Sequence, residues 1–171
     1  METLTEKLNI LLSGGDLRSV SGADEAAKII RSQQDFDVLF SYMYNSDRLI
    51  VMRAADAAEK ASKKHSSFLD SHKADLIALT SEAQDKELKW HLAQMVCRLK
   101  MDDHEKNEVF RILKSRALDK DESRIVRVNS VQALYEISRG SEPLSKNFNE
   151  IINDIRKENI PSLNARIKKL I

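Results

Sequence analysis

Apolar and polar positions alternate with helical spacing along most of the chain, and one such pattern recurs. Three segments align without a gap at a spacing of 38 residues, and they begin at Arg48, Lys86 and Arg124. Within each, apolar residues fall at i, i+4, i+7, i+8 and i+11, which is one face of an α-helix. The matching positions include Ile50, Leu88 and Val126, then Met52, Trp90 and Val128, then Ala58, Val96 and Leu134. A fixed period of this length predicts stacked helix pairs that share one core.

The residue before each aligned segment supports the same register. Asp47, Asp85 and Ser123 stand at these positions. Each type can accept a hydrogen bond from the free N–H groups of a first helical turn. We therefore expect the first helix of each pair to begin directly after them.

A second helix is expected after each first helix. Three segments carry suitable apolar positions: Ser66–Ser81, Asp103–Leu118 and Ser145–Lys157. Upstream, Ala23–Arg31 and Gln34–Tyr44 predict a further, shorter pair. Pro161 favours a helix start for the last segment, Ser162–Ile171, because proline fits the first turn.

The pattern resembles the HEAT-like repeat family, within the armadillo-type α-solenoids. The third copy carries the resemblance best, through Val126-Arg127, Ser130, Ala133-Leu134 and Ile137. The resemblance implies an all-α, right-handed α-α superhelix of about four helix pairs with terminal capping helices. We expect a single domain over residues 1–171. Its repeats would cover roughly 22–45, 46–83, 84–121 and 122–158, with caps at 1–12 and 161–171.

Composition agrees with a helical protein. The 171 residues include only 4 Gly and 2 Pro, and charged residues make up 32%. The stretch from Ser13 to Gly22 is predicted to be a loop, and Gly140 is predicted to stop a helix. No apolar run reaches about 18 residues, so we expect no membrane span. A lone cysteine, Cys97, and an N-terminus unlike a signal peptide favour a cytoplasmic location.

Motifs for chemistry are weak throughout the chain. The histidines, His65, His72, His91 and His104, lack the spacing of zinc ligands and are interpreted as helix-end or surface residues. Trp90 is interpreted as a packing residue, with base stacking as the alternative. We predict no catalytic residue, no cofactor and no metal site, so the chain is expected not to be an enzyme.

Charge is nearly balanced, with a net value of +1 at pH 7. This balance argues against a dedicated nucleic-acid clamp. Arg48, Lys86 and Arg124 share one register and would form a basic row along one edge of the stack, although ordinary solvation of helix faces is the favoured explanation. The family resemblance implies that second helices line a concave binding surface. The residues expected to bind a partner there are Lys73, Arg111, Lys114, Asn153 and Lys157.

These residues stand among acidic ones such as Asp75, Glu108 and Asp154. A mixed surface suits a polar protein or peptide better than a phosphate backbone. We therefore expect a non-enzymatic protein-binding or scaffold module. The alternative is nucleic-acid binding, including a role in DNA repair such as that of HEAT-like glycosylases.

Overall fold

A computed structural model describes residues 2–13 and 21–171, and these residues form helices without any strand. The all-helical fold of repeated helix pairs predicted from the sequence is confirmed. Most of the loop predicted between Ser13 and Gly22 lies outside the described residues. The chain divides into two compact units, residues 1–72 and 73–171. Their boundary falls inside the predicted repeat 46–83, and the single domain over 1–171 stays a prediction.

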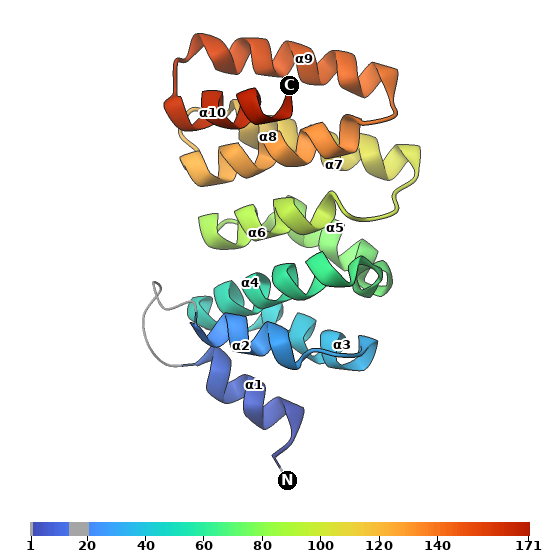
Figure 1. Ribbon diagram of the computed structural model, residues 1–171, viewed down its shortest axis with the longest axis vertical. Helices are drawn as coiled ribbons and strands as arrows, with labels where there is room; N and C mark the ends of the chain where they lie inside the picture. The colour runs from blue at the N-terminus through green and yellow to red at the C-terminus, as the bar shows by residue number, and fades with distance from the viewer. Residues whose placement is uncertain (1, 14–20) are drawn as a thin grey trace. The chain divides into compact units, whose positions relative to one another are not determined.

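The first unit is built around one long helix. Its elements are α1 (Leu4–Leu12), α2 (Ser21–Ile29), α3 (Gln33–Ser41), the 3-10 helix η1 (Tyr42–Tyr44), α4 (Arg48–Lys64) and the 3-10 helix η2 (Ser66–His72). All the other elements of the unit pack against α4 (Figure 1). Four alanines of α4, at positions 54, 55, 57 and 58, are fully buried, so small side chains occupy the buried faces of this helix. Small side chains let neighbouring helices come close while the interior stays well packed.

Two backbone contacts join α1 to its neighbours. A β-carbon added at Gly22, near the start of α2, would collide with the carbonyl oxygen of Leu11 in α1. The buried side chain of Arg53 in α4 donates from Nη1 to the carbonyl oxygens of Leu12 and Ser13, at 3.2 and 3.1 Å. These carbonyls belong to the end of α1, where helical acceptors lack partners within the helix. The missing side chain of Gly22 therefore allows α1 and α2 to come close, and the long side chain of Arg53 binds the end of α1.

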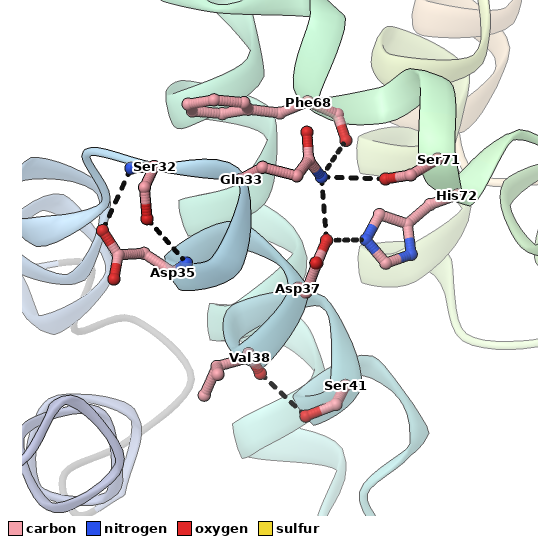
Figure 2. Close-up of polar contacts among 9 residues, drawn as sticks. All are labelled: Ser32, Gln33, Asp35, Asp37, Val38, Ser41, Phe68, Ser71 and His72. Carbon is pink, nitrogen blue, oxygen red and sulfur yellow. Dashed lines mark hydrogen bonds and ion pairs between the residues drawn. The ribbon is translucent and has the colours of Figure 1, made fainter.

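Figure 2 shows how η2 is attached to α3 within the first unit. The amide Nε2 of Gln33 lies 2.8 Å from Asp37 Oδ1, 3.1 Å from the carbonyl oxygen of Phe68 and 2.8 Å from Ser71 Oγ. His72 Nε2 lies 2.6 Å from the same Asp37 oxygen. The ring of His72 also stacks on Phe40, with 4.0 Å between the ring centroids. One glutamine and one carboxylate thus connect the middle and the C-terminal end of η2 to α3.

The sequence prediction of a single helix over Ser66–Ser81 is wrong at its N-terminal half. Residues 66–72 form η2, and the α-helix α5 covers Lys73–Glu82. Ser66, Ser67, Asp70 and Ser71 fall in the first part, and such short polar side chains compete for backbone hydrogen bonds. Apolar periodicity alone does not register that competition.

The second unit consists of two layers of helices. One layer holds the first helices: α6 (Lys86–Val96), α8 (Arg124–Ser138) and α10 (Pro161–Leu170). The other holds the second helices: α5, α7 (Asp103–Leu118) and α9 (Glu142–Lys157). Within each layer, consecutive helices pack side by side, and pairs such as α7 with α8 join the layers (Figure 1). The predicted C-terminal cap, α10, therefore extends the first-helix layer.

The predicted helix starts are confirmed in all three aligned copies. The helices α4, α6 and α8 begin at Arg48, Lys86 and Arg124. The side chains of Asp47 and Ser123 accept from first-turn N–H groups, whereas Asp85 stands at the same position without a side-chain capping bond. Gly140 has φ of +78° and follows the C-cap of α8, as expected for a helix stop.

Candidate interaction surface

The five residues predicted to bind a partner all lie in the second-helix layer of the second unit. Lys73 begins α5, Arg111 and Lys114 lie on α7, and Asn153 and Lys157 lie on α9. We call the solvent-facing side of α5, α7 and α9 the second-helix surface. These five residues differ in their exposure and in the ion pairs and hydrogen bonds that they form within the protein.

Lys73 is engaged in holding two second helices together. Its Nζ lies 2.7 Å from Glu105 on α7, and about two thirds of the Lys73 side chain is shielded from solvent. Glu105 also completes a capping box with Asp102 at the start of α7. The hydrogen bond from Lys73, followed by the bond to the Asp102 backbone, lowers the pKa of Glu105. Lys73 therefore has a structural role at the α5–α7 contact.

Lys114 is likewise engaged, at the α7–α9 contact. Its Nζ donates to Asn147 Oδ1 at 2.9 Å, and the side chain is only partly exposed. Lys157 is exposed and pairs at 2.8 Å with Asp154, one turn earlier on α9. That hydrogen bond is the main reason that the pKa of Asp154 is lowered. Exposed pairs of this kind contribute little and open easily.

Arg111 differs from the three lysines among the five predicted residues. Its side chain is exposed, and no described residue forms an ion pair with it. Arg111 lines an open depression of about 430 Å³ together with His104, Asn107 and Glu108, one or two turns earlier on α7. A guanidinium, an imidazole and an amide can donate hydrogen bonds there, and Glu108 can accept them. Sequence reasoning named Arg111 but missed His104, Asn107 and Glu108, although their i, i+3, i+4, i+7 spacing puts them on one helix face.

The aligned basic positions in the first helices have a different role. Arg124 and Lys86 are exposed at the first residues of α8 and α6. The basic residues three positions later, Arg127 and Lys89, instead form ion pairs within the protein. Lys89 Nζ lies 2.6 Å from Glu122, and Arg127 pairs with Glu158 at 2.8 Å. In both cases a first helix is joined to the chain that follows its own second helix. These contacts brace the repeats, and nothing in them resembles a ligand site.

Two further residues were candidates for chemistry. Trp90 is half-buried, and its ring lies 3.6 Å from that of His91, centroid to centroid. His91 is only 2% exposed, so its interpretation as a helix-end or surface histidine is wrong. The equivalent residue in the preceding copy, Arg53, is also buried at 3% exposure. Both helices are thus buried over a wider arc than their apolar positions alone indicate.

Across residues 2–13 and 21–171, no three His, Cys, Asp or Glu side chains are grouped closely enough to hold a metal ion. No helix within these ranges has both the length and the apolar character needed to cross a bilayer.

Comparison with known families agrees with the helical architecture. The family model described as HEAT repeat domain matches residues 16–171. No curated protein and no solved structure gives a match. The match covers most of the chain, including every helix from α2 to α10. The paired helices, the 38-residue spacing and the family match lead to one conclusion: this chain belongs to the HEAT repeat family.

Proposed function

We propose that this chain is a non-enzymatic protein-binding module whose second-helix surface holds a polar segment of a partner protein. HEAT repeats generally mediate protein–protein interaction or scaffolding, and proteins built from them are typically non-enzymatic. That general property supports the class of function. The choice of surface rests on the side chains of α7.

The exposed Arg111 in its depression is the observation that supports this surface best. A guanidinium without an ion-pair partner can bind a carboxylate or a backbone carbonyl of another chain in bidentate fashion. Asn107 and His104 add donors beside it, while Glu108 accepts hydrogen bonds from a partner's N–H groups. Donors and an acceptor in one open depression suit a peptide, which presents both kinds of group.

The same composition disfavours a phosphate backbone as the partner. Glu108 lines the depression, and Asp154 lies on the neighbouring helix α9. Carboxylates next to a run of phosphates are repelled, whereas one Asp or Glu beside a basic residue is tolerated by a mixed protein surface. We therefore favour a protein partner, and nuclease treatment in the crosslinking experiment distinguishes it from nucleic acid.

Site-specific photo-crosslinking tests the proposal directly. Benzoylphenylalanine would replace Asn107 in one variant and Ile125, an exposed residue of α8 in the other layer, in the control. We expect a nuclease-resistant protein adduct from position 107 and none from position 125. Adding Arg111→Glu should remove the adduct, while Arg124→Glu, the same change at an exposed residue of α8, should leave it.

Three results would contradict the proposal. An adduct of equal strength at position 125 would place binding on the other layer. An adduct that persists with Arg111→Glu would remove Arg111 from the interface. Recovery of nucleic acid, or loss of every adduct after nuclease treatment, would favour the nucleic-acid alternative.

A further inference from the structure

Basic side chains gather at one end of the first unit, although this unit is acidic as a whole. Residues 1–72 contain nine Lys and Arg against eleven Asp and Glu. Five of those nine line two open depressions of about 310 and 290 Å³, which share Ala27, Lys28 and Lys64. The five are Lys28, Arg31, Lys60, Lys63 and Lys64. We call this region the α2–α4 basic depression, because all five lie in or just beyond the C-terminal parts of α2 and α4.

Two of these five basic residues, both lysines, already have counter-ions. Lys60 Nζ lies 2.5 Å from Asp24 and 2.8 Å from Asp56. Lys28 pairs with Glu25 at 2.7 Å, and both of those side chains are largely exposed. No described residue forms an ion pair with Arg31, Lys63 or Lys64, and all three are exposed. Three positive charges around one hollow therefore lack a partner within the described residues.

Helix dipoles account for only part of this excess. Lys28 stands in the last turn of α2, and Lys63 and Lys64 stand in the last turn of α4. Each helix C-terminus carries roughly half a negative charge, so two ends together offset about one cation. The remaining positive charge attracts an anion from outside the unit, most strongly where low-dielectric walls surround it.

The floor of the depression is apolar and made of small or recessed side chains. Ala61 and Ile30 are only 4% and 5% exposed, and Ala27, which lines both depressions, is partly exposed. An apolar floor inside a ring of cations fits a ligand that combines a small apolar group with negative charges on either side. A bare phosphate chain has no group for that floor.

We infer that the α2–α4 basic depression binds an acidic segment of a partner protein, in which Asp or Glu residues flank one small apolar side chain. The apolar side chain sits over Ala27 and Ala61, and the carboxylates meet Lys63, Lys64 and Arg31. This surface belongs to the first unit and shares no residue with the second-helix surface. The inference therefore does not depend on the proposed function.

A defined peptide serves as the probe. The peptide Glu-Glu-Val-Glu-Glu with blocked ends would be titrated into the isotope-labelled full chain, and backbone amide shifts would be followed by NMR. The same peptide with Gln in place of each Glu is the charge control. We expect shifts concentrated in residues 27–31 and 60–65 with the acidic peptide, and weaker binding as salt rises.

Two pairs of neighbouring lysines provide matched variants. Lys63→Glu with Lys64→Glu should weaken the acidic peptide about tenfold, because two exposed ion pairs are lost and the reversed charges repel the peptide. Lys168→Glu with Lys169→Glu makes the same change in the last turn of α10 and should leave the affinity unchanged. Asp24→Asn removes a carboxylate from the wall and leaves Lys60 with Asp56 as its one counter-ion among the described residues, so it should tighten binding about twofold to threefold.

Several results would overturn the inference. The absence of localised shifts at millimolar peptide would remove the site, and equal binding of the Gln peptide would remove the role of charge. Equal weakening by the α10 variant would reduce the effect to net charge. Tighter binding of a short single-stranded DNA at the same residues would refute the acidic-protein partner. Arg111→Glu should not change peptide affinity, which keeps this test separate from that of the second-helix surface.

Discussion

Arg127 and Glu158 form a two-pronged ion pair in which the two ends differ in their access to water. Arg127 Nη1 and Nη2 lie 2.9 and 2.8 Å from the two carboxylate oxygens. The Arg127 side chain is 2% exposed, whereas that of Glu158 is 15% exposed. Arg127 Nε also donates to the carbonyl oxygen of Ala117 at 2.9 Å. One buried arginine thus connects α8 to the ends of α7 and α9.

This asymmetry predicts unequal costs for removing either partner. Glu158→Gln leaves the buried guanidinium without a counter-charge, so we expect a loss of about 3 kcal/mol in the free energy of unfolding. Arg127→Met leaves a carboxylate that can turn toward water, and we expect a smaller loss of about 1–2 kcal/mol. Urea unfolding followed by circular dichroism measures both. Equal losses, or a larger loss for Arg127→Met, would contradict this account.

The same pair predicts how acid acts on the second unit. The hydrogen bond from Arg127 lowers the pKa of Glu158 from its ordinary value of 4.5 in spite of partial burial. A carboxyl group with a lowered pKa stabilises the folded state above the unfolded-state value, and this stabilisation is lost as pH falls through the folded-state value. We therefore expect the free energy of unfolding to fall below about pH 4.5.

Replacement of the carboxyl group isolates its share of that acid response. Glu158→Gln should be less stable at neutral pH and should show a shallower decline below pH 4.5 than the unchanged chain. Asp154→Asn is the control, because its carboxyl group also has a lowered pKa but belongs to an exposed pair on α9. If the free energy of unfolding of Glu158→Gln declined in acid as steeply as that of the unchanged chain, other carboxylates would determine the response.

Sequence reasoning located the helices well because their signals are local. The apolar period, the N-cap residues Asp47 and Ser123 and the stop at Gly140 each act within a few neighbouring positions. The start of α8 at Arg124 and both bounds of α7 follow from such signals. The 3-10 helix η2 was missed because apolar periodicity registers neither the short polar side chains within 66–71 nor the contact with Gln33, which lies more than 30 residues earlier in the chain.

The candidate surface was predictable in outline only. Periodicity assigned Arg111 and Lys114 correctly to the polar side of α7, yet both look alike in sequence. Only the tertiary contact with Asn147 distinguishes Lys114, which is held, from Arg111, which is exposed without an ion pair. The α2–α4 basic depression was missed for a related reason. Lys28 and Lys64 stand 36 positions apart in a segment whose summed charge is negative, so the local excess does not appear in a count.

Gly22 and Gly140 should respond differently to substitution by alanine and asparagine, because different physical causes favour glycine at the two positions. At Gly22 a side chain is obstructed by backbone, since an added β-carbon would collide with the Leu11 carbonyl oxygen of α1. We expect Gly22→Ala to cost about 1–3 kcal/mol, because a backbone atom must shift, although alanine favours the helix itself. Gly140 has open space around it, and only its positive φ opposes a side chain. Gly140→Ala should cost about 1 kcal/mol.

Asparagine distinguishes the two causes. It tolerates the left-handed conformation, so Gly140→Asn should retain most of the stability. Gly22→Asn should be at least as damaging as Gly22→Ala, because steric obstruction depends on volume. Thermal unfolding of the four variants provides the measurement. A Gly22→Asn variant as stable as the unchanged chain would disprove the close approach of α1 and α2.

The attachment of η2 to α3 predicts a local effect of Gln33 on hydrogen exchange. Its amide has two N–H groups for three acceptors, so at least one hydrogen is shared (Figure 2). Gln33→Leu removes all three bonds and should speed amide exchange in residues 66–72, while α4 keeps its protection. Gln34→Leu is the matched control, because Gln34 is exposed at the next position of the same helix. Equal exchange in the two variants would show that the stacking of His72 on Phe40, and not the glutamine, holds η2 in place.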